Sequence, residues 1–398
     1  MQAAGTTGIP EAKQFSEGQQ RAVKKSSKRI YAAAVIIIIA IIAIAALFMQ
    51  AGRPSAPRPS SVATTSINSS APTTIFQTTT IPQHYAGLSG YISCIGPSYN
   101  ATSELRQFAY APISSSGTLG AWSTPIQAPI ALLYPSCFSA SGNFYCINGF
   151  TQNFSSEILS LYMHVPDTSG TQNATTPYQY SPIPICTSYE NMAFCISANT
   201  SSASSQQYVY EANASASGLS QWKQVSKYPV SNYVISGCTT YSGNIYCVGG
   251  YETNASGETR FTQSVYYSSI YANGSLTKWR QTTSFPIPIT QSSCTAYNGY
   301  LYCTGSMLNS SIYYSKINPN GSIQPWNSVA YPAGIKYPSC GALDGYIYCM
   351  GGINSTSASV NYTFIARLNS NGSIAGWQRA PEFPAAPVMY ASAACAVS

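Results

Sequence analysis

Residues 238–250, CTTYSGNIYCVGG, hold two cysteines nine positions apart on either side of a Ser-Gly pair. The same arrangement, more or less closely kept, begins at four other cysteines: Cys137, Cys186, Cys294 and Cys340. The unit therefore returns about every 50 residues, a period typical of propeller blades and other repeat architectures.

A tight hairpin explains the spacing of the two cysteines. If Ser242 and Gly243 are the central residues of a primed two-residue turn, Cys238 lies directly opposite Cys247 in a non-hydrogen-bonded pair. Such pairs bring the two Cα atoms close enough for a disulfide. The same count predicts four more cross-strand disulfides: Cys137–Cys146, Cys186–Cys195, Cys294–Cys303 and Cys340–Cys349.

The composition favours an oxidising compartment. The 398 residues include 12 cysteines and 2 histidines, and only 7% of them are charged. Zinc is the alternative explanation for so many cysteines, but no C-x2-C pattern occurs, and His84 and His164 lie far from any cysteine pair. We therefore expect disulfides, no metal and no cofactor, in a domain outside the cytoplasm.

The positive net charge belongs to the N-terminal part of the chain. Residues 1–58 hold 8 Lys and Arg against 2 Glu, whereas the remaining 340 residues hold 10 basic against 9 acidic residues. The net charge of +7 is therefore almost entirely outside the repeats. Nucleic acid is accordingly not expected as a partner of the folded part.

Ile30–Met49 is a run of 20 uncharged, mostly apolar residues, long enough to cross a bilayer as a helix. Four basic residues stand directly before it: Lys24, Lys25, Lys28 and Arg29. They predict a cytoplasmic N-terminus and contact of Ile30–Met49 with membrane lipid. A buried core helix and a cleaved signal peptide are the alternatives, but the run is long for the core of a signal peptide.

Each repeat continues after its second cysteine with a variable loop, a strand, a short turn and a tryptophan. The five tryptophans share this one position: Trp122, Trp222, Trp279, Trp326 and Trp377. The second repeat lacks it, and Tyr178 and Tyr180 are the candidate substitutes. Four short antiparallel strands per repeat, here called A to D from the axis outward, are typical of a propeller blade. We interpret the tryptophans as packing residues between blades rather than as sugar-binding platforms.

The repeats resemble the kelch-repeat β-propeller family over residues 85–398. The residues that carry the resemblance are the glycine doublets Gly249-Gly250 and Gly351-Gly352, the third-strand tyrosines Tyr266 and Tyr314, and the tryptophans. The doublet decays in the other repeats, and cross-strand disulfides are not a general kelch feature. The resemblance implies an all-β, six-bladed propeller. The expected order is a basic cytoplasmic tail at 1–29, a transmembrane helix at 30–49, a Pro/Ser/Thr-rich disordered stalk at 50–84 and the propeller at 85–398.

Cys94 and Cys395 are left over by the hairpin count. Cys94 stands where the second cysteine of a repeat belongs, and Cys395 stands where a first one belongs. We therefore expect the last strand to complete the first blade, with a disulfide between these two residues. The alternative is a separate hairpin within residues 85–94, YAGLSGYISC, with Tyr85 in the cysteine position.

The connections between strands B and C are the expected binding loops, because long loops on a rigid scaffold commonly carry function. Each contains a candidate N-glycosylation sequon: Asn100, Asn153, Asn199, Asn254, Asn309 and Asn354. Ordinary polar loops copied by duplication are the alternative. The Asn-Gly-Ser sites between strands C and D receive less weight, because a tight turn already favours Asn-Gly. They are Asn273, Asn320 and Asn371.

Two charge pairs, Glu104/Arg106 and Glu258/Arg260, fall in matching B–C loops of blades one and four. They are the best polar candidates for ligand contacts, with solvated surface charges as the alternative. The predicted function is a membrane-tethered surface propeller, held outside the cell, that binds a protein or glycan through the face formed by B–C and D–A connections.

The alternative function is a structural, glycosylated component of a cell-envelope coat. An extracellular carbohydrate-active enzyme is the least favoured reading. Strand positions expected nearest the axis contain no charged residue and no histidine, and catalytic groups would need to converge there.

Overall fold

The computed structural model describes the repeat region in thirteen stretches. They are residues 87–97, 105–132, 135–147, 159–165, 172–175, 184–198, 206–231, 233–253, 258–289, 292–305, 309–356, 358–384 and 394–398. All of them belong to one compact unit, Pro82–Ser398. The predicted tail, transmembrane helix and stalk lie outside the described residues. Within those stretches, no helix is long and apolar enough to span a bilayer.

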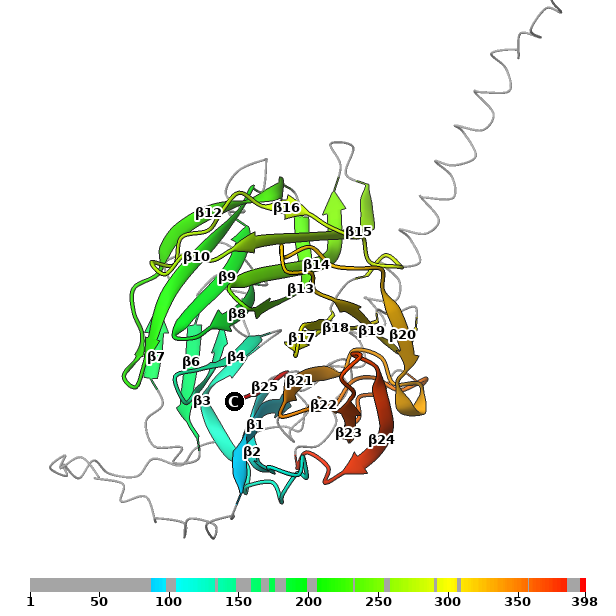
Figure 1. The fold of residues 1–398 in the computed structure, drawn as a ribbon. Helices are drawn as coiled ribbons and strands as arrows, with labels where there is room; N and C mark the ends of the chain where they lie inside the picture. The colour runs from blue at the N-terminus through cyan, green and yellow to red at the C-terminus, as the bar shows by residue number, and fades with distance from the viewer. Residues whose placement is uncertain are drawn as a thin grey trace, which may run out of the picture. The chain divides into compact units, whose positions relative to one another are not determined.

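The described strands form six antiparallel sheets set around a common axis (Figure 1). Sheet 1 contains β25 (Ala394–Val397), β1 (Leu88–Pro97), β2 (Leu105–Ser114) and β3 (Ile126–Leu132). Sheet 2 contains β4 (Ser136–Ala140), β5 (Asn143–Ile147), β6 (Leu159–His164) and β7 (Gln172–Thr175). Sheet 3 contains β8 (Ile185–Tyr189), β9 (Met192–Ala198), β10 (Gln206–Ser215), β11 (Gly218–Leu219) and β12 (Lys223–Ser231).

The second half of the ring follows the same order. Sheet 4 contains β13 (Tyr233–Tyr241), β14 (Asn244–Thr253), β15 (Thr259–Ser269) and β16 (Arg280–Gln281). Sheet 5 contains β17 (Cys294–Tyr297), β18 (Tyr300–Thr304), β19 (Ser311–Lys316) and β20 (Asn327–Ala330), and the short 3-10 helix Pro332–Gly334 follows it. Sheet 6 contains β21 (Ser339–Leu343), β22 (Tyr346–Met350), β23 (Thr363–Leu368) and β24 (Ile374–Ala380).

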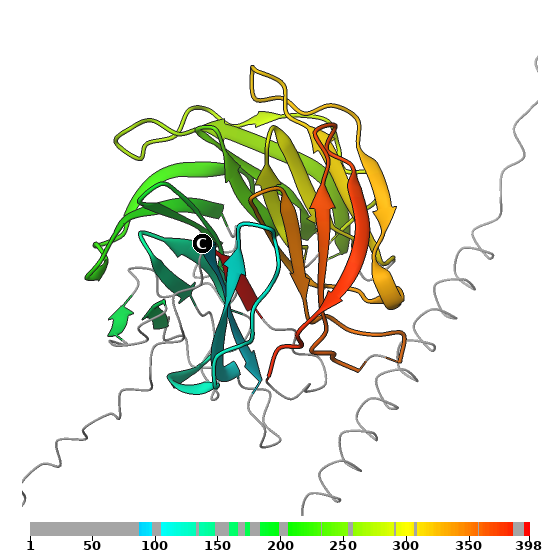
Figure 2. The ribbon, with the colours of Figure 1, turned by 60° about the horizontal axis from the view of Figure 1, so that its bottom comes forward.

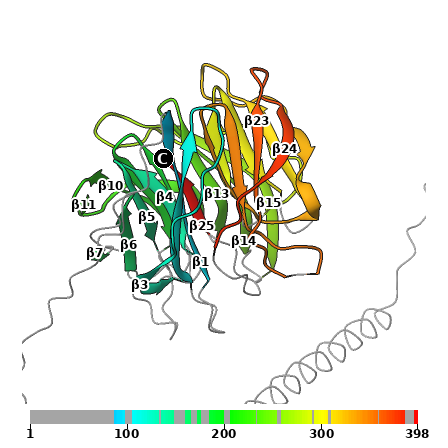
Figure 3. The ribbon, with the colours of Figure 1, turned by 90° about the horizontal axis from the view of Figure 1, so that it is seen from below.

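The predicted all-β propeller is confirmed. The innermost strands contact one another in a closed circuit: β25, β4, β8, β13, β17, β21 and again β25. Figures 2 and 3 show the sheets standing side by side around this inner circuit. Sheets 2 to 6 are meanders, so their A–B and C–D turns lie at one end and their B–C connections lie at the other. Sheet 1 has the same antiparallel order, with the C-terminal strand β25 in place of a connected first strand.

Sheet 3 departs from the expected four strands, and the prediction is wrong there. Strand β10 is ten residues long and pairs with two different outer strands, β11 near Ala214 and β12 from Gln206 to Glu211. The chain separates from β10 between β11 and β12, so the fourth strand of sheet 3 is split into these two pieces. The other five sheets have four strands each in the described part of the chain.

The tight turns between strands A and B have the predicted primed geometry. In four of them the first central residue has φ between 45° and 49°, and the glycine after it has φ between 70° and 82°. Positive φ at both central positions defines a type I′ turn, whose twist matches that of the flanking strands. The four turns are Ser141-Gly142, Ser242-Gly243, Asn298-Gly299 and Asp344-Gly345.

All six predicted disulfides are present. The five hairpin pairs have their cysteines directly opposite each other, with Cα atoms 4.1 to 4.2 Å apart. Cys94 is bonded to Cys395, and β1 pairs with β25, so the last strand completes sheet 1 as expected. The alternative hairpin within residues 85–94 is wrong, because Leu88–Pro97 is a single strand.

The core is divided into apolar clusters, one at each junction between neighbouring sheets in the described structure. At four junctions a tryptophan of one sheet meets the aromatic residue that follows the tryptophan of the preceding sheet. The ring centroids are 4.8 to 5.1 Å apart in Tyr228–Trp279, Phe285–Trp326, Tyr331–Trp377 and Phe383–Trp122. The interpretation of the tryptophans as packing residues is therefore confirmed at these junctions.

The junction between sheets 1 and 2 is built differently. Sheet 2 has no tryptophan, and the residues five and six positions after Trp122, where the other pairs place the partner ring, are Gln127 and Ala128. Both halves of the aromatic pair are thus absent together. Phe108 and Phe144 supply the ring contact instead, with centroids 5.3 Å apart. Tyr178 and Tyr180, the candidate substitutes for the tryptophan, lie outside the described residues.

Candidate functional site

Strand β14 carries the B–C connection of sheet 4 away from the ring core. β18 and β22 end one residue after their second cysteine, whereas β14 continues six residues beyond Cys247 to Thr253. The pairing with β15 is kept to the last residue, Thr253 opposite Thr259. This hairpin therefore presents its end on the side of the ring that bears the B–C connections.

A glycine doublet allows β14 to make this extension. Gly249 and Gly250 have φ of 58° and 120°, and the register with β15 shifts between Val248 and Gly250. The Gly250 N–H donates to the carbonyl of Ile289 at 2.8 Å. A side chain at Gly249 would collide with Ile289, so only glycine fits where the strand passes the D–A connection.

The end of this hairpin combines an aromatic ring with both signs of charge. Glu258 lies just before β15, and Arg260 and Phe261 lie within it; all three are exposed. The exposed fraction of Phe261 is 52%, unusual for a large apolar residue. We call Glu258, Arg260 and Phe261 the β14–β15 tip. Exposed aromatic and arginine side chains are the types most enriched where proteins bind partners.

The other predicted site residues are only partly visible. Glu104 lies outside the described residues, and Arg106 belongs to β2 without a described side chain. The structure therefore places Glu258 with Arg260 but does not test whether the pair of sheet 1 matches it. Four of the six predicted B–C sequons also lie outside: Asn100, Asn153, Asn199 and Asn254. Asn309 and Asn354 are described, and both are half-buried.

Phe261 was missed by the sequence reasoning, which looked for charged residues in the loop. It occupies an ordinary strand position, so the pattern alone predicts a half-buried side chain. Only the extension of β14 and β15 beyond the ring makes it exposed.

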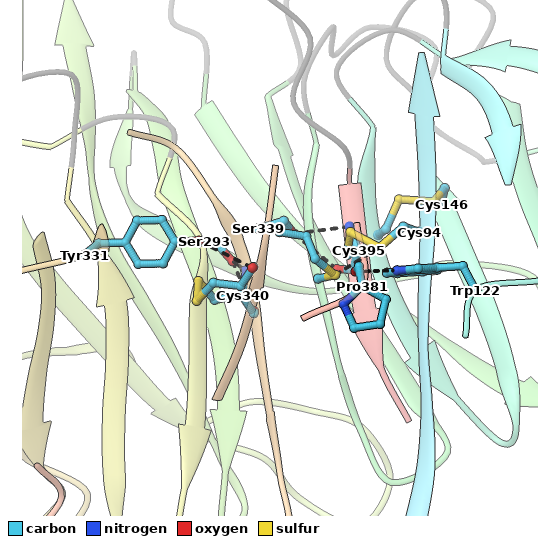
Figure 4. Close-up of a disulfide and its surroundings, with 12 residues drawn as sticks. Cys94, Trp122, Cys146, Ser293, Tyr331, Ser339, Cys340, Pro381 and Cys395 are labelled. Carbon is cyan, nitrogen blue, oxygen red and sulfur yellow. Dashed lines mark hydrogen bonds between the residues drawn. A yellow bond between two sulfur atoms is a disulfide. The ribbon is translucent and has the colours of Figure 1, made fainter. Parts of the chain in front are cut away.

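Serine hydroxyls link the innermost strands of neighbouring sheets. Ser136, Ser293 and Ser339 each precede the first cysteine of a repeat, and each hydroxyl accepts the N–H of the corresponding cysteine in the next sheet at 2.7 to 3.1 Å. Each hydroxyl also donates to the carbonyl of that cysteine. Figure 4 shows two of these links, Ser293 to Cys340 and Ser339 to Cys395, beside the closing disulfide. The recurring Ser-Cys pair was the available sequence signal.

Buried tyrosines form a second set of links between sheets. The Tyr302 hydroxyl donates to the Gly372 carbonyl at 3.0 Å, and the Tyr348 hydroxyl donates to the Gly117 carbonyl at 3.1 Å. Burial, more than the neighbouring charges, raises the pKa of both tyrosines well above its ordinary value. These hydroxyls stay protonated at neutral pH and hold backbone carbonyls, which is a structural task.

Within the described residues, no three His, Cys, Asp or Glu side chains come together as a metal site. The β14–β15 tip is the place in the described structure where the predicted charges Glu258 and Arg260 lie beside an exposed ring. No protein-family model matches the chain, and no curated protein matches it in sequence. The propeller and its disulfides consequently rest on the structure itself.

Proposed function

We propose that the chain is a membrane-tethered, kelch-like, six-bladed propeller that binds a protein or glycan outside the cell through the β14–β15 tip. The observation that carries the proposal is the exposure of Phe261 beside Arg260 and Glu258 at the end of a hairpin that extends past the ring. An aromatic face flanked by charged groups suits a sugar ring or a partner protein side chain.

Two further observations support the kelch-like and extracytoplasmic parts of the proposal. Gly249-Gly250 and Gly351-Gly352 all have positive φ, which explains why this family hallmark needs glycine at both positions. All twelve cysteines are paired, and stable disulfides are typical of oxidising compartments. The anchor itself, Ile30–Met49, is proposed from the sequence alone. We propose no catalytic role and no cofactor.

Binding measurements on the tip test the proposal, with the purified protein screened on glycan arrays and against proteins of the same cell surface. Truncating a central aromatic contact commonly costs about 2 kcal/mol, or about 30-fold in affinity. We expect this loss for Phe261→Ala and a smaller one for Arg260→Ala. Tyr271→Ala is the matched control, because Tyr271 is 56% exposed in the same sheet but lies in the C–D turn at the opposite end. Equal losses in all three variants would refute a site at the tip.

A structural coat component is the second candidate. It is favoured by one observation: every sheet carries its own disulfide, which suits a resistant outer layer. Ordered self-assembly of the purified protein, seen by electron microscopy and unaffected by Phe261→Ala, would favour this function over ligand binding.

A further inference from the structure

Three turns between strands C and D share one side-chain arrangement. In each, the asparagine Oδ1 accepts the N–H of the serine two residues later at 3.0 to 3.1 Å and its hydroxyl at 2.7 Å. All three asparagines are exposed. They belong to the Asn-Gly-Ser tripeptides at Asn273, Asn320 and Asn371.

The hydrogen bonds to Oδ1 fix the orientation of each amide group. Because the oxygen faces the serine, the nitrogen Nδ2 is held on the other side of the amide plane. Within the described part of the chain, Nδ2 of these three asparagines donates no hydrogen bond. The nitrogen that a glycan would occupy is thus left to solvent at all three turns.

In two other Asn-x-Ser/Thr sequons, the side-chain nitrogen of the asparagine already donates a hydrogen bond within the folded protein. Asn309 Nδ2 donates to the Tyr313 hydroxyl at 2.6 Å. Asn361, in the sequence Asn-Tyr-Thr, donates from Nδ2 to the Phe383 carbonyl at 3.2 Å, and the threonine of this sequon is completely buried. A glycan at either position would first have to break a hydrogen bond of the folded protein.

We propose that Asn273, Asn320 and Asn371 are N-glycosylation sites of the folded propeller, and that Asn309 and Asn361 are not modified once the chain has folded. The ranking from sequence, which favoured the B–C sequons over these turns, is therefore reversed for Asn309. Asn354 shares the favourable arrangement, since its Oδ1 accepts the N–H and the hydroxyl of Thr356.

The chemistry is a glycosyl transfer from a phosphate-activated, lipid-linked saccharide. The bond between sugar C1 and the donor phosphate oxygen breaks, and a bond between C1 and Nδ2 forms. Nδ2 loses one proton to a base of the transferase, and the lipid phosphate leaves. No oxidant or reductant is needed.

Tyr271 supplies independent support at one of the turns. It is the most exposed of the large hydrophobic side chains in the described structure, and it stands two residues before Asn273. An attached sugar would cover this ring and bury part of its apolar surface.

The C–D turns lie at the end of each sheet opposite the B–C connections. The turn between β23 and β24, which contains Asn371, stands at the upper rim of the ring in Figure 3. Glycans there would cover the end of the propeller away from the β14–β15 tip. The modified end and the proposed binding end are therefore separate.

An acceptor assay on the full-length protein tests the proposal. The protein is made in an oxidising compartment that lacks glycosylation and is purified in its folded form in detergent. It is then incubated with a purified oligosaccharyltransferase and the lipid-linked donor of this enzyme. Mass spectrometry of peptides then gives the occupancy of each sequon. We expect occupancy at Asn273, Asn320 and Asn371 at least tenfold above that at Asn309 and Asn361. The reduced, unfolded chain is the control, in which the five sites should be modified alike.

Tyr313→Phe provides a sharper variant, because it removes one hydroxyl and keeps the buried ring. It frees Asn309 Nδ2, so occupancy at Asn309 of the folded variant should rise severalfold while Asn361 stays unmodified. Equal occupancy at all five sequons in the folded wild-type protein would overturn the proposal, and so would modification of none of the three C–D turns.

The glycosylation proposal rests on the proposed location of the propeller outside the cytoplasm. Different results would reject the location and the glycosylation sites. Free thiols and cytoplasmic location in the native cell would reject the placement while leaving the acceptor assay unchanged. Bare C–D turns on a disulfide-bonded protein at the cell surface would reject the glycosylation sites alone.

Discussion

Lys223 has a structural role that its exposure hides. Its Nζ lies 2.9 Å from the carboxylate of Glu211, which is 1% exposed at the junction of sheets 3 and 4, and it donates to the Asn273 carbonyl at 3.2 Å. In the next sheet the equivalent strand position is Tyr267, whose hydroxyl donates to the Asn320 carbonyl. The ion pair thus replaces a tyrosine as the link to the neighbouring turn.

We expect Lys223→Ala to lower the free energy of unfolding by about 3 kcal/mol, because it leaves the buried carboxylate of Glu211 without its cation. Glu211→Gln should cost less, since the lysine left behind is 54% exposed and retains water. Urea denaturation measures both. Lys227→Ala is the control, an exposed lysine of the same strand above the Tyr208 ring, and it should cost less than about 1 kcal/mol. Equal losses for the two lysines would contradict this role.

At the scale of the elements, the aromatic pair is what joins one sheet to the next. Four of the five tryptophans lie next to an identified ring contributed by the preceding sheet. Two of the four also donate from Nε1 to a carbonyl of that sheet. Trp122 donates to Pro381, as Figure 4 shows, and Trp326 donates to Thr283. The rings thereby carry both apolar burial and a directional contact across the junction.

Trp279→Ala should lower the free energy of unfolding by about 3 to 5 kcal/mol, the usual cost of removing a buried large aromatic side chain. Trp279 is 8% exposed and packs edge-on against Tyr228. Thermal or urea unfolding gives the value, with the exposed Tyr271→Ala of the same sheet as the control. A loss no greater than that of the control would show that the aromatic pair is dispensable.

The repeat pattern predicted the hairpins well because their structure is decided locally. Turn type, register and the cross-strand cysteines follow from ten consecutive residues and from positive φ at two of them. The split outer strand of sheet 3 was not predictable in this way. Its pairing depends on how far β10 extends and where the outer chain leaves it, and no local pattern marks either point.

For the whole molecule, the bond between Cys94 and Cys395 differs from the other five disulfides in the length of chain that it closes. It joins residues 301 positions apart, whereas the hairpin bonds join residues 9 apart. Closing a longer loop removes more entropy from the unfolded chain. Without it, β25 would be held only by non-covalent contacts, namely backbone pairing with β1, the hydrogen bonds of Ser339 and apolar packing. Loss of β25 would open the ring and expose two strand edges.

We therefore expect the double variant Cys94→Ala/Cys395→Ala to lose about 5 to 6 kcal/mol and the control Cys137→Ala/Cys146→Ala to lose about 3 kcal/mol. Both pairs combine one buried and one half-buried cysteine, so the side-chain losses are matched. Urea midpoints compared under oxidising conditions measure the difference. An equal loss in both variants would show that ring closure adds nothing beyond a local disulfide.

The buried tyrosines predict a loss of stability in alkaline solution. Burial raises the pKa of Tyr246, Tyr302 and Tyr348 above the ordinary value of 10.0. Above about pH 10 the unfolded chain releases these protons more readily than the folded protein, so it binds fewer protons and is favoured. The contribution of these tyrosines to the free energy of unfolding is therefore complete below about pH 10 and decreases as the pH rises further.

Urea midpoints measured from about pH 8 to about pH 11 should fall steeply above about pH 10. Tyr302→Phe should reduce this steepness, because it removes one of the titrating groups, although it also loses the hydrogen bond to Gly372 and about 1 kcal/mol at neutral pH. A flat profile to about pH 11 would contradict the assignment of these buried tyrosines as groups that stay protonated in the folded protein.

The sequence by itself determined the repeat, the primed turns, all six cysteine pairs and the packing role of the tryptophans. These features depend on residues close in the chain, or on positions that recur at a constant spacing, so the pattern contains the geometry. The tertiary structure alone decided which side chains are open to a partner. Phe261 is exposed because β14 and β15 extend past the ring, and Asn309 differs from Asn320 because the Tyr313 hydroxyl holds its nitrogen. Such contacts join side chains in space rather than in sequence, and tripeptides that share the Asn-x-Ser pattern therefore acquire different chemistry once the sheets have closed around the axis.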